Sequence, residues 1–190
     1  MILPIVQYGQ PVLRKKGARI EFITPEISQF IDDMFQTMYD AAGIGLAAQQ
    51  AGRALQLTVI DVREVKDRPA TLEIGGEPAS VEDFMPLVLI NPEIQPLGEP
   101  AAGPEGCLSF PEIYADITRP EFVQVKALNA KGEPIAFKAG GLLARAVQHE
   151  VDHLNGILFI DRMTAAKKKE LQPELDLLMA ETKAAQAKKK

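Results

Sequence analysis

Two histidines and a glutamate stand at a spacing that can hold a metal ion and activate water. His149, Glu150 and His153 form an HExxH pattern, and they include both histidines of the 190-residue chain. Histidines four residues apart on a helix project from one face, so both imidazoles can reach one ion. Glu150 can take a proton from a water molecule at that ion. The alternative is that His149 and His153 lie on the protein surface and bind no ion. The helix is largely apolar and is expected to be buried, and unpaired polar groups in a buried helix are costly.

A third protein ligand is needed for a catalytic site of this kind. One class of zinc peptidases extends the pattern to a third histidine. Here Gly156 matches that extension, but Phe159 occupies the histidine position. The missing ligand is therefore a carboxylate or the only thiol, that of Cys107. A lone cysteine is more often a small core residue, yet beside a site with two histidines Cys107 is the leading candidate. Its Gly and Pro neighbours are typical of a loop or a sheet edge.

The helix that carries the HExxH pattern is predicted to be buried. Residues 140–155 have one narrow polar stripe, and apolar side chains occupy most of the remaining circumference, as in a helix inside a protein. Another helix is predicted from Pro25 to about Ala42, with Thr24 as its N-cap and Gly43 as the left-handed residue after its end. The polar stripe of the later helix consists of Arg145, Gln148, Asp152 and Asn155.

The chain between these helices is predicted to form strands. Gly75 and Gly76 are expected at a hairpin tip, and residues 129–132 at a turn. Two helices separated by many strands predict an α+β fold, with mostly antiparallel sheets around the central buried helix. A helical tail follows, in which Pro173 is expected to divide the helix or begin a new one. The strand candidates are 55–62, 86–94, 122–128 and 134–138.

Charge is distributed unevenly along the chain. Residues 167–190 carry seven lysines and four acidic residues, so this tail has a net charge of +3 and the rest of the chain one of −8. The acidic body argues against sequence-specific binding of nucleic acid, whereas the tail either meets an anionic partner such as RNA or is simply solvated. No apolar run approaches the roughly 20 residues of a membrane helix. A single cysteine excludes an internal disulfide, and a cytoplasmic protein is expected.

Three segments together resemble one enzyme family. They are GIGLAAQQ at 43–50, EGCLS at 105–109 and QHEVDHLNG at 148–156. Taken alone, the first of them favours a helix end followed by a packing segment of small residues. In this order and at these separations the three resemble peptide deformylase, a family that removes the formyl group from the N-terminal methionine of new polypeptides. The resemblance extends from about residue 2 to residue 161.

The resemblance implies a catalytic metal site. Cys107, His149 and His153 would bind one divalent ion per chain, Fe(II) in the cell and often Zn(II) instead. Glu150 would act as general base and then as general acid. The substrates implied are N-formyl-methionyl peptides, and the product released with the free N-terminus is formate.

The resemblance also implies contacts with the substrate. Gln50 and the backbone N–H of Leu108 would stabilise the oxyanion, and Glu105 would pair with Arg119. The residues expected to bind the substrate backbone or its methionine side chain are Ile44, Gly45, Leu142, Ala146 and His149.

The chain departs from familiar members of the family in two places. Residues 63–85 form a longer connection, and Ile113-Tyr114 stands where some members carry an arginine that touches bound peptide. Residues 1–164 are expected to form the catalytic domain and residues 165–190 a basic helical tail. Our hypothesis is that this tail contacts the ribosome near the exit tunnel.

Two other functions compete with deformylation. An HExxH endopeptidase would account for the two histidines and the glutamate, but not for the other two segments. A metal-stabilised protein without activity, docked on ribosomes through its tail, would not need Glu150 or Gln50. Assaying formyl-Met-Ala against casein separates the first alternative from deformylation.

Overall fold

The computed structural model describes residues 1–188; Lys189 and Lys190, which contribute to the tail's charge, lie outside the described residues. Within this range seven antiparallel strands form one sheet in the order β1-β2-β5-β6-β7-β3-β4, so the α+β prediction with antiparallel pairing and a C-terminal helix is confirmed. The helices are α1 (Pro25–Asp40), α2 (Val81–Phe84), α3 (Gly141–Leu154) and α4 (Ala165–Ala187). The strands are β1 (Gly45–Ala47), β2 (Leu57–Ile60), β3 (Ala70–Ile74), β4 (Glu77–Pro78), β5 (Leu87–Cys107), β6 (Phe110–Leu128) and β7 (Pro134–Gly140).

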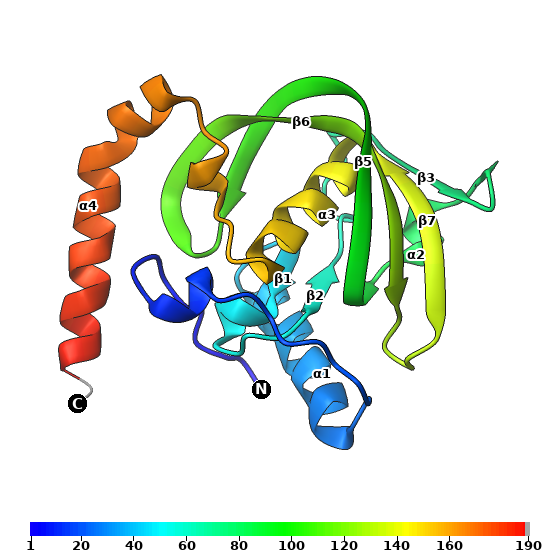
Figure 1. Cartoon of the computed structure of the whole chain (residues 1–190), viewed down its shortest axis with the longest axis horizontal. Coiled ribbons are helices and arrows are strands. Elements are labelled where there is room, and N and C mark those ends of the chain that lie inside the picture. The colour runs from blue at the N-terminus through cyan, green and yellow to red at the C-terminus, as the bar shows by residue number, and fades with distance from the viewer. Residues whose placement is uncertain (189–190) are drawn as a thin grey trace.

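Helix α3 lies at the centre of the molecule, under the arch that β5 and β6 form (Figure 1). Every residue of α3 except Gly141 and Arg145 is buried. Its apolar residues pack with β2, β5, β6 and β7 into one hydrophobic cluster. The predicted polar stripe is also largely buried, because Gln148 and Asp152 are only 5% and 8% exposed. Buried polar groups must be satisfied internally, and these two form hydrogen bonds to β6.

Helix α1 begins as predicted but ends differently. The Thr24 hydroxyl accepts a hydrogen bond from the Ile27 N–H, as an N-cap does. The left-handed residue after the helix is Ala42, with φ of 52°, and not Gly43 as predicted. Gly43 is needed for a different reason. A Cβ at that position would lie 2.7 Å from Cδ1 of Leu108, so the glycine allows the chain to approach Leu108 closely.

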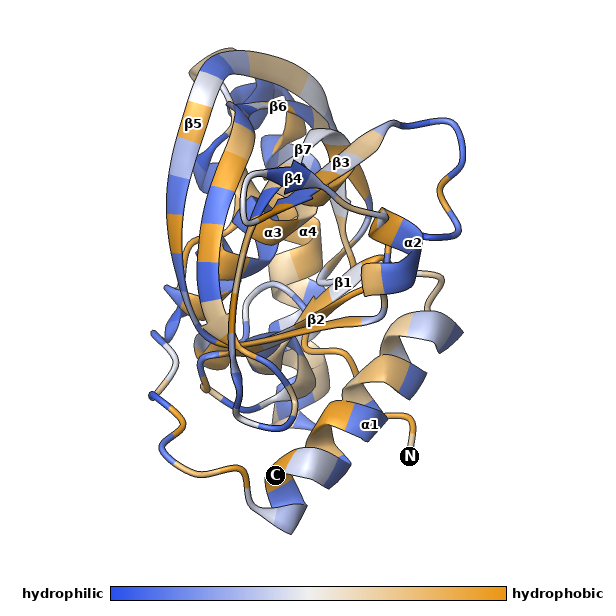
Figure 2. Cartoon of the chain, turned by 90° about the vertical axis from the view of Figure 1, so that its right-hand side faces the viewer, coloured by the Kyte–Doolittle hydropathy of each residue, from blue (hydrophilic) through white to orange (hydrophobic). Residues whose placement is uncertain are grey.

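Strands β5 and β6 are much longer than predicted. The candidate 86–94 covers only the beginning of β5, and the candidate 122–128 covers only the end of β6. Residues 95–121 were not predicted as strand, because their Pro and Gly content is typical of loops. Strand β2 pairs with β5 only along residues 87–90. Along the rest of its length, no other strand in the described part of the chain pairs with this edge of β5, and prolines are tolerated at such an edge. The two strands show alternating hydrophobic and hydrophilic bands (Figure 2).

Irregular pairing bends the β5–β6 ribbon and ends it at Cys107. The register shifts near Ile90, near Leu97 and between Gly106 and Cys107, and such bulges curve a strand and redirect side chains. Cys107 is the last residue of β5, consistent with the predicted loop or sheet-edge position. It pairs with Phe110 across a two-residue turn. This ribbon therefore brings the cysteine over α3.

The connection 63–85 adds two strands to the sheet and a short helix beside them. It contains β3, β4 and α2, and β3 pairs with β7. The predicted hairpin tip is confirmed, because Gly75 and Gly76 have φ of 61° and 83°. Such left-handed pairs are typical of tight hairpin turns. The candidate 55–62 is also confirmed as a strand, although β2 is shorter.

Helix α4 continues through Pro173, contrary to the prediction of a break there. A proline removes one backbone hydrogen bond and distorts a helix without always ending it. Figure 1 shows the first turns of α4 set at an angle to the rest. Packing holds the helix in place, because Leu175 is 1% exposed in a cluster with Val6, Phe110 and Phe159. The tail is therefore packed against the body.

We predict that Leu175→Ala lowers the free energy of unfolding by about 2–5 kcal/mol, because it removes buried methyl groups and leaves a cavity. Leu177→Ala, on the same helix at a side chain 61% exposed, should change it by less than about 0.5 kcal/mol. Urea denaturation measures both values. Equal effects of the two substitutions would contradict the packing of α4.

Candidate metal centre

Cys107, His149 and His153 meet at one point. Helix α3 presents the two histidines one turn apart, and the end of β5 presents the cysteine. Their ligand atoms all lie within 4.8 Å of one another, and Sγ of Cys107 is 3.3 Å from Nε2 of His153. These three form the candidate ligand group that the sequence indicated.

The three donors suit a single divalent metal ion. Burial lowers the pKa of His153 well below its ordinary value, so its imidazole is neutral, which is the form that binds metals. Its Nδ1 is buried without a hydrogen-bond partner among the described residues. The polar contact of this imidazole is therefore made by Nε2. A thiolate with two imidazoles favours zinc or iron over magnesium. Three protein ligands are the number found at catalytic zinc sites, which keep one position for water or substrate.

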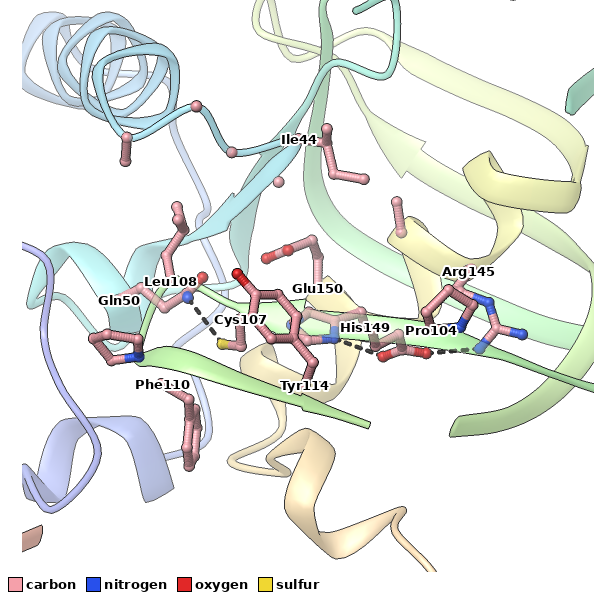
Figure 3. A pocket seen from close by; sticks show the side chains of 18 of the residues that line it. Ile44, Gln50, Pro104, Cys107, Leu108, Phe110, Tyr114, Arg145, His149 and Glu150 are labelled. Carbon is pink, nitrogen blue, oxygen red and sulfur yellow. Dashed lines mark hydrogen bonds and ion pairs between the residues drawn. The ribbon is translucent and has the colours of Figure 1, made fainter. Parts of the chain in front are cut away.

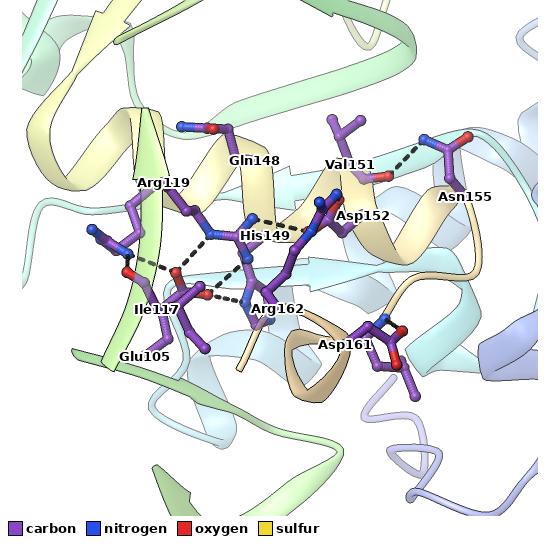
Figure 4. A network of polar contacts seen from close by, with 12 residues as sticks. Glu105, Ile117, Arg119, Gln148, His149, Val151, Asp152, Asn155, Asp161 and Arg162 are labelled. Atoms are coloured by element: carbon purple, nitrogen blue, oxygen red, sulfur yellow. Dashed lines mark hydrogen bonds and ion pairs between the residues drawn. The ribbon is translucent and has the colours of Figure 1, made fainter. Parts of the chain in front are cut away.

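A buried carboxylate orients His149. Oε1 of Glu105 lies 2.8 Å from Nδ1 of His149 (Figure 4), so Nε2 is the ring nitrogen that could bind a metal ion. Arg119 donates to both oxygens of the same carboxylate, at 2.7 and 2.9 Å, as the resemblance implied. Burial alone would raise the pKa of Glu105, but hydrogen bonds with His149 and Arg119 outweigh it and hold this pKa well below its ordinary range. Glu105 is therefore a permanent anion beneath the site.

Arg145 is a second cation that contacts Glu105. From the sequence alone, Arg145 was expected only on the polar stripe of the helix. Its Nη1 donates to Glu105 at 2.8 Å and to the Ile117 carbonyl at 2.7 Å, and its Nη2 donates to the Ala101 carbonyl at 2.9 Å. Gly103 provides the space, since a Cβ there would lie 2.9 Å from Nη2. Arg145 precedes His149 by four residues, so the helical period indicated a shared face. It joins α3 to both long strands.

Asp152 extends the network away from the site. It accepts from Arg119 at 2.9 Å and from Arg162 at 2.8 and 3.1 Å. Arg119, together with Arg145 on Glu105 and Arg162 on Asp152, offsets the two negative charges, whereas an unpaired buried ion is costly. Arg162 lies after α3 and was not singled out from the sequence.

Glu150 faces the same space as the three candidate ligands. Its carboxylate lies 3.4 Å from the Thr58 hydroxyl, and a Cβ on Gly45 would collide with it. Gly45 therefore allows β1 to lie directly against the glutamate. Burial raises the pKa of Glu150 to about 7.

Gln50 is held against the turn between β5 and β6. Its Oε1 accepts from the Ala47 N–H at 2.9 Å, and its Nε2 lies 3.2 Å from the Ser109 hydroxyl and 3.5 Å from Sγ of Cys107. The amide is thus fixed with its donor end toward the thiol. Leu108 occupies the same turn, and its carbonyl accepts from Gln7.

A cavity of about 610 Å³ opens over these groups (Figure 3). It has the volume of a small-ligand site. Tyr114 is 67% exposed at its rim, whereas Ile113 is buried and does not face it. His153 lies deeper, at 1% exposure, and Arg119 also lies outside the lining. The candidate residues that line this one cavity are Ile44, Gly45, Gln50, Glu105, Cys107, Leu108, Leu142, Ala146, His149 and Glu150.

Comparison with known proteins identifies the family. The model of the polypeptide deformylase family matches residues 2–169. The chain belongs to the peptide deformylase family. It is 47% identical to the peptide deformylase of Methylacidiphilum infernorum, over 93% of this chain and 92% of that protein, and 44% identical to that of Opitutus terrae, over 97% of both. Members of the family remove the N-formyl group in a metal-dependent hydrolysis.

Solved deformylase structures share the fold. The peptide deformylase of Synechococcus elongatus, determined in complex with actinonin, aligns with a TM-score of 0.76 and 42% identity, over 90% of this chain and 85% of that one. Peptide deformylase 1B of Arabidopsis thaliana aligns with a TM-score of 0.82 and 36% identity, over 96% and 93%. Within residues 1–188, no helix combines the length and apolarity needed to cross a membrane.

We predict that Arg145→Met speeds the loss of zinc to a chelator by about tenfold, as is typical when support of a metal ligand is removed. Methionine keeps an apolar stem but cannot hold Glu105, so His149 is less firmly oriented. Arg162→Met is the control, because Arg162 pairs with Asp152 and does not touch Glu105. A rate of zinc loss in Arg145→Met equal to that of the control would contradict this role.

Proposed function

We propose that this deformylase binds its single divalent ion through Cys107, His149 and His153 and hydrolyses N-formyl-methionyl peptides beside it. The observation that carries the proposal is the convergence of the only thiol and both imidazoles within 4.8 Å, in contact with the cavity that Glu150 lines. When bound there, the ion supplies a Lewis acid that makes water more acidic and polarises a carbonyl.

Glu150 moves the proton in this proposal. Its carboxylate takes a proton from water as the water oxygen adds to the formyl carbon. It then delivers that proton to the departing nitrogen as the C–N bond breaks, which yields formate and a free amine. Its burial beside Thr58 and Gly45 supports the role, because burial raises the pKa of Glu150 to about 7, where the group can both accept and donate a proton. The HExxH motif on α3 thus combines two ligands with the base.

Gln50 and the N–H of Leu108 are proposed to stabilise the oxyanion that forms when water adds. A single donor of this kind can contribute about 2.7–4 kcal/mol to transition-state stabilisation. The hydrogen bond from Ala47 to the Gln50 carbonyl supports the assignment, because it turns the amide nitrogen toward the thiol. No reorganisation of that side chain is then needed during the reaction.

The substrate is proposed to lie extended along β1. Among residues 1–188 this strand pairs only with β2, so its other edge, and Ile44 just before it, offer backbone groups to a peptide. The methionine side chain would enter the part of the cavity formed by Leu142, Ala146 and His149. Apolar walls of small and medium side chains suit its unbranched, flexible chain.

Fe(II) is proposed as the physiological ion, with Zn(II) able to occupy the site. Sulfur is a soft ligand and favours either ion over magnesium. Cys107 and ferrous iron both react with oxidants, so the iron form would be sensitive to air.

Residues 1–164 are proposed as the catalytic domain, and α4 with the residues after it as a surface for the ribosome in the cytoplasm. Lysines at 167–169 lie near the start of α4, Lys183 lies near its C-terminal end, and Lys188 is its C-cap. Such a surface suits an RNA partner, and nascent chains are the substrates of the family. The lone cysteine is consistent with a reducing compartment.

We predict that Glu150→Gln lowers kcat for formyl-Met-Ala by at least about 10²-fold, because the amide cannot accept the proton. Formate release measures the rate, and metal analysis must show a full complement of bound ion. Glu121→Gln, at an exposed site on β6, should leave kcat unchanged. Near-normal turnover by Glu150→Gln, or cleavage of casein in preference to the formyl peptide, would refute the proposal.

We predict a higher kcat/KM for protein loaded with Fe(II) under anaerobic conditions than for the zinc form. Zinc in proteins is most often limited to four ligands, whereas Fe(II) serves sites with several open positions. Both forms are prepared from one metal-free batch and assayed with formyl-Met-Ala. Equal activity of the two forms would reject the preference for iron.

We predict that replacing Lys167, Lys168 and Lys169 by glutamine weakens the binding of this protein to ribosomes, and that added salt weakens the wild type more than the variant. These substitutions spare the packing of Leu175, which a deletion of 165–190 would remove. Replacing the exposed Lys15, Lys16 and Lys66 gives the same change in charge as a control. Ribosome binding that is equal in both triple variants would exclude the tail as the contact.

A further inference from the structure

The connection 63–85 places an arginine at the cavity. Arg68 lines the same cavity as Ile44 and Leu142, although it comes from a part of the sequence to which the family resemblance assigned no role. Its side chain is half-buried. The connection therefore contributes to the substrate site.

The backbone next to Arg68 is fixed against the beginning of α3. The Leu142 N–H donates to the Pro69 carbonyl at 2.9 Å, Ala70 bridges to Gly141, and β3 then pairs with β7. Gly141 has a φ of 60°, and a Cβ there would collide with the Pro69 carbonyl. Pro69 also restricts Arg68 to extended backbone conformations. These contacts fix the backbone of Arg68 next to Leu142, which lines the cavity.

Unlike Arg145, the other arginine of the cavity, Arg68 has no ionic partner among residues 1–188. Arg145 is bound to Glu105, while His149 and Glu150 already have roles at the metal. Among residues 1–188, no carboxylate lies within ion-pair distance of Arg68. A guanidinium presents a planar fork of donors that matches a carboxylate. In a peptide with a blocked C-terminus, only Asp or Glu side chains supply that group.

We propose that Arg68 binds an acidic side chain of the substrate, so that this deformylase favours peptides with Glu or Asp among the three residues after formyl-methionine. The inference rests on the proposed function. Glu112 of β6 also lines the cavity, and its carboxylate repels an acidic substrate residue beside it. The preference for Glu or Asp is therefore expected only at peptide positions whose side chains approach Arg68.

The test uses C-terminally amidated formyl-methionyl peptides that carry Glu or Gln at position two, three or four. The ratio of kcat/KM for Glu over Gln is measured at each position for the wild type, Arg68→Met and Lys66→Met. Lys66 is exposed on the same connection and does not line the cavity, so it is the matched control. We expect the wild type and Lys66→Met to favour Glu about two- to fivefold at one position at least, as for a solvent-accessible ion pair.

Arg68→Met should abolish that preference, Arg68→Glu should reverse it in favour of Lys peptides, and added salt should weaken it in the wild type. A ratio near one at all three positions in the wild type, or a preference that Arg68→Met retains, overturns the inference while leaving deformylation intact. If the wild type fails to deformylate the Gln peptides, the proposed function itself fails, and the role of Arg68 with it.

Discussion

The buried carboxylate of Glu105 is the group on which the rest of the site depends. It accepts hydrogen bonds from two arginines and lies against Nδ1 of His149. Removing one partner from such a buried cluster typically costs about 3–5 kcal/mol, because a charge is left uncompensated. The same contacts join the end of β5 to β6 and α3. The orientation of His149, a proposed metal ligand, and the assembly of the fold are therefore maintained by one set of interactions.

The long strands explain how the ligands converge. Helix α3 fixes the two histidines relative to each other, but the thiol comes from a ribbon that must curve over the helix. Bulges and an open strand edge allow that curvature in a segment rich in proline and glycine. Glycines are also required where backbone approaches a side chain closely, as Gly45 does at Glu150 and Gly103 at Arg145. The fold thus positions the chemistry through a few close contacts between distant segments.

The sequence predicted what depends on local spacing. Histidines four residues apart, a helix apolar around most of its circumference and a Thr-Pro helix start were recognised from the residues. The residues also made Cys107 the leading candidate for the third ligand, and the deformylase resemblance implied the same residue. Other contacts between distant segments were missed. Arg145 was placed on a polar stripe, but its acceptors on β5 and β6 were not foreseen, because the proline-containing parts of both strands were not predicted as strand. Pro173 was given too much weight, since packing of α4 outweighs one lost hydrogen bond.

Anomalous diffraction from crystals of the metal-loaded protein, measured on both sides of the absorption edge of the bound ion, tests the central claim most directly. The account predicts one strong peak per chain, bonded to the sulfur of Cys107 and to Nε2 of both histidines, with no fourth protein ligand. A peak elsewhere, or a fourth side chain that closes the coordination sphere, would contradict it.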